Sequence, residues 1–268
     1  MRRVLTSVVA VAAAVSLATA CGSGDSDQTA APAPSAPATT TAPPESPPAP
    51  PAESPSADPT GTPTPTETTP DKLKRGVKGD RVVALQQRLT ELGYWNGGKA
   101  DGSFGALTQQ AVYALQKAAG LTRDGVVGVK TQKALDQGVR PKAKSTEGRV
   151  IEISKKKQLL LLVNDGEVEQ VLNTSTGSYE QYEQDGVTHT AATPSGKFTV
   201  SRQIDGWRDA PLGLLWRPKY FNGGIAVHGA YSIPPYAASH GCARVSVQAM
   251  NYLWKNDKIP IDTKVWVY

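Results

Sequence analysis

Apolar side chains between residues 76 and 138 recur at the three- and four-residue spacing of amphipathic helices. The first helix is expected to begin at Asp80, which can act as its N-cap, and to end at Gly93. Residues 101–111 and 124–134 resemble each other, because each has an Asp-Gly turn, a second glycine and a threonine expected just before a helix. This pattern predicts a small helical domain with an internal repeat.

From residue 150 onward, the pattern changes to the short apolar runs and alternation of β-strands. Asn-Asp-Gly at residues 164–166 predicts a hairpin turn, and Ser246 is expected to cap a helix with an apolar stripe. The predicted strands are residues 150–153, 158–163, 167–172, 197–204, 224–228 and 264–267. The predicted fold class is α+β overall, with a mostly-β domain and one helix at its side following the helical domain.

The first 71 residues have a different composition. Two arginines followed by an apolar run at residues 4–18, too short for a membrane span of about 20 residues, predict a signal peptide. Residues 22–71 contain no Lys or Arg and most of the 21 prolines, whereas all five Trp, nine Tyr and three Phe lie after residue 71. Such a segment buries too little apolar surface to offset its chain entropy, so we expect a disordered linker.

The charge follows the same division. Residues 72–268 hold 27 of the 29 Lys and Arg and 17 of the 24 Asp and Glu, a net charge of +10, and the linker holds the other seven acids. A basic folded part favours an anionic partner such as nucleic acid, anionic lipid or an anionic cell-wall polymer. The sequence contains no nucleic-acid-binding motif, so we expect no nucleic-acid partner.

The two cysteines need separate explanations. Cys21 borders the expected linker and Cys242 lies near the C-terminus, which argues against a disulfide between them. Residues 17–22, Leu-Ala-Thr-Ala-Cys-Gly, resemble a bacterial lipoprotein lipobox, in which the cysteine becomes the lipidated first residue of the mature chain. The resemblance implies a lipid anchor at Cys21, and ordinary signal cleavage after Ala20 is the alternative. Both predict an exported protein.

Cys242 lies in the run Ser239-His240-Gly241-Cys242-Ala243-Arg244, downstream of His228-Gly229. A catalytic thiol needs a base and hydrogen-bond donors for the oxyanion, and glycine beside the cysteine lets backbone N–H groups point at one spot. The three histidines are His228, His240 and His189, and the last is expected in a loop. A buried structural thiol is one alternative. Zinc held by His228, His240 and Cys242 is another, but the usual two-residue gap is missing, so we expect no metal and no cofactor.

These residues, together with Thr193-Pro194-Ser195-Gly196-Lys197-Phe198, resemble the signature of the L,D-transpeptidase (YkuD-type) catalytic domain. The paired Asp-Gly-x-x-Gly-x-x-Thr segments resemble the three-helix peptidoglycan-binding domain over about residues 74–138. The organisation expected from both resemblances is a lipoprotein signal peptide (residues 1–20), a disordered linker (21–71), a peptidoglycan-binding-like helical domain (72–140) and an L,D-transpeptidase catalytic domain (148–268).

The resemblance implies that Cys242 is the nucleophile and His228 its base. The carbonyl of Gly229 is implied to orient His228 in place of a side-chain acid. We also expect a thiolate–imidazolium ion pair, which would lower the pKa of the thiol. The short stretch between His228 and Ser239 is expected to leave only a small lid over the site.

The remaining motif residues are implied to bind or position the substrate. Ser239 and His240 would shape the loop, and backbone N–H groups near His240, Gly241 and Cys242 would form the oxyanion hole. Arg244 would order the site or bind a substrate carboxylate through its planar guanidinium. In the helical domain, a ligand groove is expected near Tyr94 and Trp95, because exposed aromatic rings stack on sugars and peptides. The alternative is that Trp95 covers the small core.

The resemblance implies an exported acyltransferase, anchored by lipid to the outer face of the membrane and reaching into the cell wall. It would act on peptidoglycan stem tetrapeptides, release D-Ala through a thioester and form 3→3 cross-links. Carbapenem-type inhibitors are expected to acylate the same thiol. An L,D-carboxypeptidase, a protein-anchoring transpeptidase and a non-catalytic wall-binding lipoprotein are the alternatives.

Overall fold

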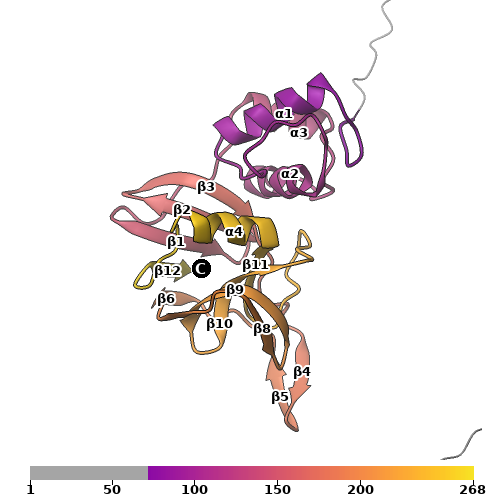
Figure 1. The fold of residues 1–268 in the computed structure, drawn as a ribbon. Coiled ribbons are helices and arrows are strands. Elements are labelled where there is room, and N and C mark those ends of the chain that lie inside the picture. Colours follow the sequence, from indigo (N-terminus) through magenta and orange to yellow (C-terminus); the bar gives the residue numbers. More distant parts are fainter. Residues whose placement is uncertain (1–71) are drawn as a thin grey trace, which may run out of the picture. The chain divides into compact units, whose positions relative to one another are not determined.

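The computed structural model describes residues 72–268, so Cys21 and the predicted signal peptide and linker lie outside the described residues. The described chain forms three helices followed by a mostly-β domain, which confirms the predicted fold class (Figure 1). The helices are α1 (Asp80–Glu91), α2 (Ala106–Ala119) and α3 (Val129–Asp136). No helix of the described residues has the length and apolar character of a membrane span.

The helix starts differ from the prediction by one to three residues. Asp80 is the first residue of α1 and its N-cap position is taken by Gly79, which has φ 118°. Thr108 and Thr131 lie inside α2 and α3 rather than before them. Both threonines are buried and use their hydroxyls in the loops of the repeat.

The internal repeat is built around two buried glutamines, one on each preceding helix. The side chain of Gln86 on α1 fills the first Asp-Gly loop. It donates to Asp101 Oδ1, Ser103 O and Thr108 Oγ1 at 2.9–3.0 Å and accepts from the Gly102 N–H at 2.9 Å. Gln116 on α2 makes the equivalent bonds with Asp124, Val126, Thr131 and Gly125. The repeated motif therefore satisfies its own polar groups internally.

Two five-stranded sheets and one hairpin make up the β-rich domain. The first sheet has the order β3-β2-β1-β12-β6 and the second the order β11-β10-β9-β7, with β8 also paired to β9. The first sheet contains β1 (Arg149–Ser154), β2 (Leu159–Asn164), β3 (Glu167–Asn173), β6 (Gly196–Thr199) and β12 (Lys264–Val267). The second contains β7 (Arg202–Gln203), β8 (Trp207–Ala210), β9 (Gly213–Asn222), β10 (Ile225–Ala230) and β11 (Ala243–Ser246), and β4 (Gln181–Gln184) pairs only with β5 (Val187–Thr190).

Most predicted strands and the predicted helix are present. Asp165 and Gly166 both have positive φ in the β2–β3 turn, as the two-residue hairpin requires. Ser246 caps α4 (Val247–Lys255) by accepting the Ala249 N–H at 3.0 Å, which confirms that prediction. The strand predicted at residues 197–204 is split into β6 and β7, which belong to different sheets. Strands β4, β5, β8, β9 and β11 were not predicted.

The strand β2 lies between two apolar clusters. Leu160 and Leu162 belong to the cluster enclosed by the two sheets and α4. Leu159, Leu161 and Val163 point the other way and pack in one cluster with residues of α1, α2 and α3. Because both faces of β2 are buried, this strand is a continuous apolar run rather than an alternating one.

The predicted ligand groove at Tyr94 and Trp95 is wrong. Tyr94 is 1% exposed and its hydroxyl donates to Val139 O at 2.7 Å. The Trp95 ring lies 5.9 Å from that of Tyr252 on α4, and the backbone N–H of Trp95 donates to Val171 O on β3 at 3.0 Å. Tyr94 is buried in the apolar cluster of the helices and β2, and Trp95 packs against the other cluster, so these rings are not free to stack on a ligand.

Candidate active site

His228 and Cys242 are brought together by the pairing of β10 with β11. These strands run parallel, with Val227 opposite Ala243 and His228 opposite Arg244. Residues directly opposite each other point to the same face, and so do residues two apart in one strand. His228, Arg244 and Cys242 therefore face the same side of the sheet, and all three line one cavity of about 630 Å³.

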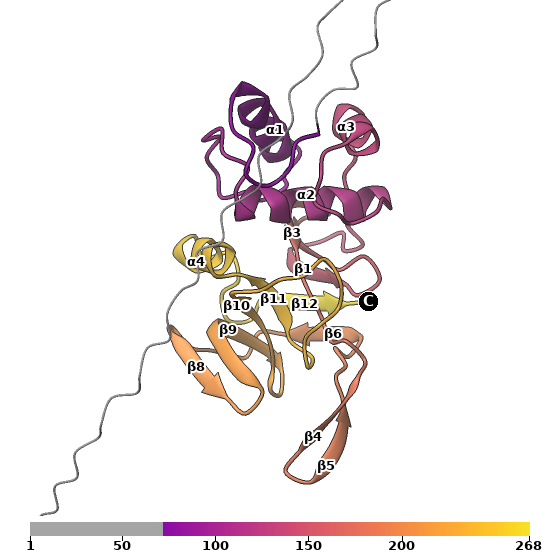
Figure 2. The same ribbon diagram turned by 90° about the vertical axis from the view of Figure 1, so that its right-hand side faces the viewer.

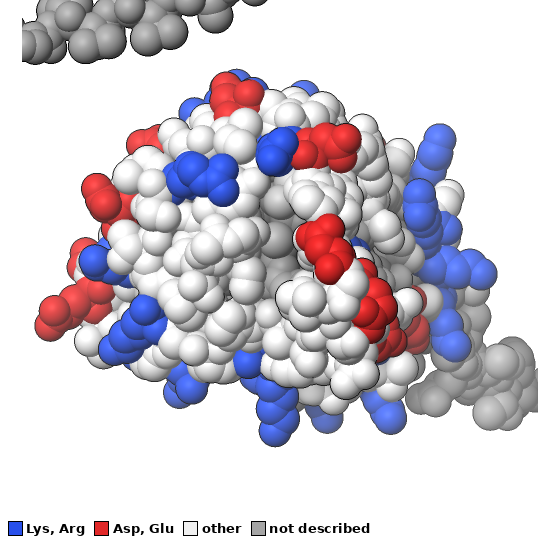
Figure 3. Space-filling view, turned by 90° about the horizontal axis from the view of Figure 1, so that it is seen from below, with Lys and Arg blue, Asp and Glu red and all other residues white. Residues whose placement is uncertain are grey.

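Two hairpins that the sequence analysis missed form the walls of this cavity. The β4–β5 hairpin contributes Tyr182, Gln184 and Thr190, and the β8–β9 hairpin contributes residues 210–215. Figure 2 shows the two hairpins projecting on either side of the β10 and β11 strands, and Figure 3 shows a hollow at this end of the molecule with acidic side chains along one side. The stretch between His228 and Ser239, expected to form only a small lid, is therefore not the whole boundary of the cavity, because these two hairpins form its walls.

Cys242 is held as a thiol by its surroundings. Its Sγ accepts the Ala226 N–H at 3.4 Å and lies 3.8 Å from Gly224 O, toward which the thiol can donate. Burial raises the pKa of Cys242, although the bond from Ala226 and the charge of Arg244 act in the opposite direction. The resting site favours the neutral thiol.

His228 is almost fully buried and its tautomer is set by one contact. Its Nδ1 lies 2.9 Å from Gly229 O, and a carbonyl oxygen can only accept, so Nδ1 carries the proton. The other nitrogen, Nε2, is then left as the basic atom. The pKa of His228 is lowered to about 4, because burial, with a smaller contribution from the charge of Arg244, outweighs the bond to Gly229, which raises it. Both pKa shifts run against the expected ion pair, since that pair needs a lowered pKa for the thiol and a raised pKa for the imidazole.

The catalytic loop, residues 239–242, is held by two hydroxyls. Ser239 Oγ donates to Cys242 O at 2.6 Å and accepts the Gly241 N–H at 3.0 Å. Thr193 Oγ1 donates to Gly241 O at 2.6 Å and accepts the Gly177 N–H at 2.9 Å. Because the Gly241 N–H is used inside the loop, it is unavailable for the predicted oxyanion hole.

Both glycines of the site are required by close packing. Gly241 has φ 147°, and a Cβ there would lie 3.0 Å from Ala192 O. A Cβ on Gly229 would lie 2.9 Å from the Trp216 ring and 3.1 Å from Met250 on α4. Gly229 thus allows β10 to approach α4 and β9 in addition to placing its carbonyl beside His228.

His240 connects the catalytic loop to a wall of the cavity. Its ring meets that of Tyr182 on β4 edge-on at 4.8 Å, and Tyr182 stacks on His189 of β5 at 5.4 Å. His189 therefore lies in a strand and not in a loop as expected. This contact packs the β4–β5 hairpin against the catalytic loop, in addition to the bond from the Ser178 N–H to Ser239 O at 2.9 Å.

Three arginines line the cavity, and no acidic side chain of the described residues does. Arg244 comes from β11, Arg202 from β7 and Arg208 from β8. The Arg202 guanidinium lies 3.6 Å from the centre of the Tyr220 ring, which holds it in place. The sequence motif indicated Arg244 alone, because Arg202 and Arg208 reach the cavity only through the pairing of β7 and β8 with β9.

One missed wall had a sequence signal. Asp185-Gly186 lies between two alternating runs, and both residues have positive φ, as an Asp-Gly hairpin turn requires. The same rule that predicted the β2–β3 turn could have found β4–β5. For Thr193, the signal was its place in the Thr-Pro motif, but its partner Gly241 lies 48 residues away.

Residues 148–267 match the L,D-transpeptidase catalytic domain, and residues 78–135 match the peptidoglycan-binding domain. An N-acetylmuramoyl-L-alanine amidase CwlL from Bacillus licheniformis is 46% identical over 79 residues, which are 29% of this chain and 22% of that protein. A spore cortex-lytic enzyme from Bacillus subtilis is 48% identical over 64 residues, 24% of this chain and 21% of that protein. The chain thus spans about a fifth of the length of these curated relatives.

The crystal structure of an L,D-transpeptidase (residues 123–326) from Xylanimonas cellulosilytica is similar over a much longer stretch. It is 55% identical, with a TM-score of 0.73, and the match covers 74% of this chain and 98% of that chain. A match at this identity over nearly the whole of the solved structure includes both the helical domain and the catalytic domain. The protein therefore belongs to the L,D-transpeptidase family.

Proposed function

We propose that this enzyme is a cysteine L,D-transpeptidase that acts on tetrapeptide stems of peptidoglycan and forms 3→3 cross-links. The observation that carries the proposal is the placement of Cys242 and a neutral His228 on one face of one cavity, with Nδ1–H of His228 fixed by Gly229 O. A base whose proton-accepting nitrogen faces the nucleophile's cavity is what thiol activation needs. The family match supports the same chemistry.

In the first half-reaction, His228 Nε2 takes the proton of the Cys242 thiol as Sγ attacks the carbonyl carbon of the third stem residue. The N–H groups of Cys242 and His240 are the donors that we propose for the oxyanion, since the Gly241 N–H is bound to Ser239. The bond to D-Ala then breaks, and His228 returns the proton to the leaving amine. A thioester on Cys242 remains.

In the second half-reaction, the side-chain amine of a neighbouring stem attacks the thioester carbon. His228 accepts a proton from this amine, and the new amide bond forms as the C–S bond breaks. The proton then returns to the sulfur, which restores the neutral pair. Water as acceptor would give a carboxypeptidase, and an amine on a protein would give an anchoring enzyme.

The charge of the cavity supports a stem peptide as substrate. A tetrapeptide stem carries carboxylates, and Arg202, Arg208 and Arg244 line the cavity without an acidic neighbour among its described lining residues. Guanidinium groups bind carboxylates through paired hydrogen bonds. The helical domain and the predicted lipid at Cys21 would keep the exported enzyme at the wall and the membrane, where such stems occur.

Purified tetrapeptide muropeptides test the proposal directly. We expect the wild type to release D-Ala and to give cross-linked dimers, and Cys242→Ala to give neither. A carbapenem is expected to add its mass to Cys242, and the adduct is expected to be absent in Cys242→Ala. Tripeptides without dimers would favour the carboxypeptidase, and no turnover with retained binding to sacculi would favour a non-catalytic wall protein.

A further inference from the structure

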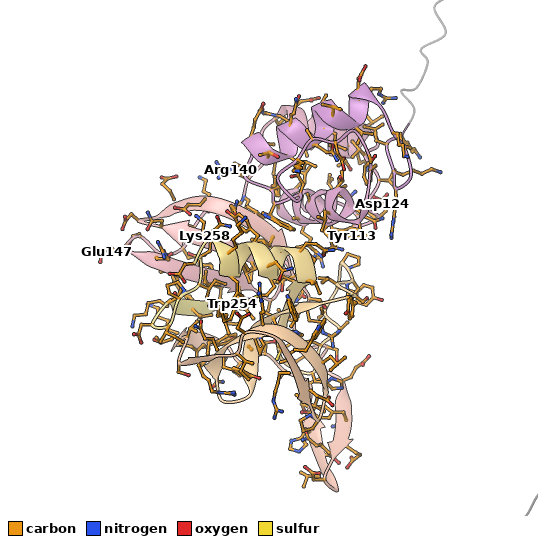
Figure 4. The ribbon with its side chains drawn as sticks, viewed as in Figure 1. Tyr113, Asp124, Arg140, Glu147, Trp254 and Lys258 are labelled. Carbon is orange, nitrogen blue, oxygen red and sulfur yellow. The ribbon has the colours of Figure 1, made fainter. Side chains whose placement is uncertain are left out.

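The helical domain shares a core and a hydrogen-bonded edge with the catalytic domain. Leu159, Leu161 and Val163 on one face of β2 pack in the same apolar cluster as the helices. Residues 93–95 lie along β3, where the Val171 N–H donates to Gly93 O at 2.8 Å. Arg140, which Figure 4 shows where the helical domain meets the sheet, donates to Val168 O. The two domains thus form one packed unit rather than two domains joined by a linker.

Lys117 on α2 is buried at this shared surface, where the residue is 2% exposed. Its Nζ donates to Gln158 O at 2.8 Å, to Asn173 Oδ1 and to Thr174 O at 3.0 Å. All three acceptors belong to the catalytic domain, and none is a carboxylate. A buried amine is costly unless each N–H is paired, so this side chain fixes its acceptors more tightly than an apolar contact would.

The acceptors of Lys117 begin a buried segment, residues 173–176, which we call the bridging segment. Thr174 Oγ1 donates to Arg244 O at 2.8 Å, and the Arg244 N–H donates to Ser175 O at 3.0 Å. Thr176 O accepts the N–H groups of Ala238 and Ser239 at 3.0 and 2.9 Å. The bridging segment therefore holds both ends of the run that contains Cys242.

The loop at residues 231–238, which leads into the catalytic loop, also contacts the helical domain. Gln110 Nε2 on α2 donates to Ile233 O at 3.2 Å, and Gln110 Oε1 accepts from Asn173 Nδ2 at 2.5 Å. Arg123 Nη1 donates to Pro235 O at 3.0 Å. Two side chains of the helical domain thus fix the backbone of a loop that contributes Ser232 to the cavity.

We propose that the helical domain is a positioning element of the active site, in which Lys117 is the central positioning residue and Gln110 supports it. Through the bridging segment and the 231–238 loop, these side chains set where Cys242 and Arg244 stand relative to His228. The inference rests on the proposed function in that it takes Cys242 as the reacting group. Burial lowers the pKa of Lys117, whereas the three oxygen acceptors around Nζ match the three N–H groups of the protonated amine.

The chain offers a matched pair of variants for the test. Gln116 is adjacent to Lys117 and equally buried, but its side-chain bonds stay within the helical domain. Lys117→Met and Gln116→Met in the full chain both remove a buried polar group, and both are expected to lower the melting temperature. Only Lys117→Met removes contacts with the catalytic domain, so the two variants separate positioning from general destabilisation.

The measurements are made well below the lower of the two melting transitions. We expect Lys117→Met to lower kcat for tetrapeptide turnover by roughly 10- to 100-fold, the effect of small misplacement of reacting groups, with KM within about threefold of the wild-type value. The rate of iodoacetamide alkylation at Cys242, followed by mass spectrometry of its peptide, should also change. Gln116→Met should match the wild type in both. Equal kcat and alkylation rates in the two variants would overturn the proposal.

If Lys117→Met does not fold, Gln110→Ala against Gln109→Ala gives the same comparison, because Gln110 lies at the partly exposed edge of the contact. We expect a reduction of kcat of about threefold to tenfold for Gln110→Ala alone, and equal kcat in this pair would reject the role of the helical domain. The alkylation rate does not depend on turnover. A wild type without transpeptidase activity would therefore reject the proposed function, while the alkylation comparison still decides the positioning role.

Discussion

The Asp-Gly loops of the helical domain and the catalytic loop at residues 239–242 are built by similar means. In each, a glycine takes a conformation or a close approach that a larger residue would not allow, and buried side chains bind the backbone of the loop. Gln86 and Gln116 fill the Asp-Gly loops, and Ser239 and Thr193 hold the catalytic loop.

The two kinds of loop differ in what remains after these bonds are made. In each Asp-Gly loop, the polar groups form hydrogen bonds with one buried glutamine. All of these bonds lie within the helical domain. The catalytic loop directs Cys242 into a cavity, beside a histidine whose pKa lies well below its ordinary value. The polar groups of the repeated motif thus serve to hold its own loops, whereas the catalytic loop places a titratable thiol in a cavity.

The largest effect on activity is expected from His228, because the proposed reaction of the Cys242 thiol needs a base. The Asp-Gly loops carry no such reaction. His228→Gln should keep the fold but lower kcat for stem turnover by roughly 10²- to 10⁴-fold, the usual contribution of general acid–base catalysis. Steady-state kinetics with a tetrapeptide stem, together with circular dichroism to check folding, measure this effect. A variant with more than a tenth of wild-type kcat would show that another group activates the thiol.

The pH dependence of the wild type serves as the control for this variant. Only neutral His228 can accept the proton, and its folded pKa is lowered to about 4. Activity should therefore persist below pH 6 and fall as the pH drops through about 4, and this acid limb should be absent from the residual activity of His228→Gln. An acid limb near the ordinary histidine pKa of about 6.5 would contradict a neutral, buried base.

A smaller effect is expected from Thr193, which holds the catalytic loop without touching the reacting atoms. Thr193→Val keeps the shape but leaves Gly241 O and the Gly177 N–H without their partner. We expect a loss of about 1–3 kcal/mol in the free energy of unfolding and a fall in kcat of roughly 10- to 100-fold as the loop shifts. Urea denaturation and turnover kinetics measure the two quantities.

Thr263 provides the matched control, since it is also buried in the catalytic domain but its hydroxyl has no hydrogen-bond partner. Thr263→Val should leave kcat unchanged and should not lower stability, because no bond is lost. If Thr193→Val behaved like Thr263→Val in both measurements, the threonine of the Thr-Pro segment would not be holding the loop.

The smallest effect on activity is expected from the Asp-Gly loops. Gln86→Leu removes four hydrogen bonds inside the helical domain, which should lower the free energy of unfolding by about 1–3 kcal/mol. Activity at a temperature where the variant is folded should equal that of the wild type. Exposed Gln87 is the control, and Gln87→Leu should be close to neutral. If folded Gln86→Leu lost activity, the Asp-Gly loop would affect catalysis as well as stability, which would contradict the difference drawn between the two kinds of loop.

The sequence was sufficient wherever the determining contacts are local. Helix periodicity, the Asn-Asp-Gly turn and the Ser246 cap depend on neighbouring residues, and their elements are present. The continuous apolar run of β2 also predicted a strand, but which side each leucine faces depends on the helical domain packing against the sheet. Tyr94 and Trp95 were misplaced for the same reason, because their burial comes from β3 and α4.

In the active site, the motif identified the reactive pair but not its electrostatics. The direction of each pKa shift depends on burial, and the burial of His228 and Cys242 results from two sheets and a helix packing together. The expected ion pair therefore runs against the direction of both pKa shifts. The arginines on β7 and β8 were missed because strand pairing, which the sequence does not specify for such short strands, brings them to the cavity.

The neutral resting state of Cys242 has a consequence for the lifetime of an exported enzyme. Oxidants and thiol–disulfide exchange attack the thiolate far faster than the thiol. In the proposed mechanism, a site that raises the thiol pKa by burial keeps the sulfur in its unreactive form until His228 takes the proton as the sulfur attacks a substrate carbonyl. Outside the cell, where reducing systems are scarce, the proposed mechanism would thus protect the Cys242 thiol from sulfenic acid formation between turnovers.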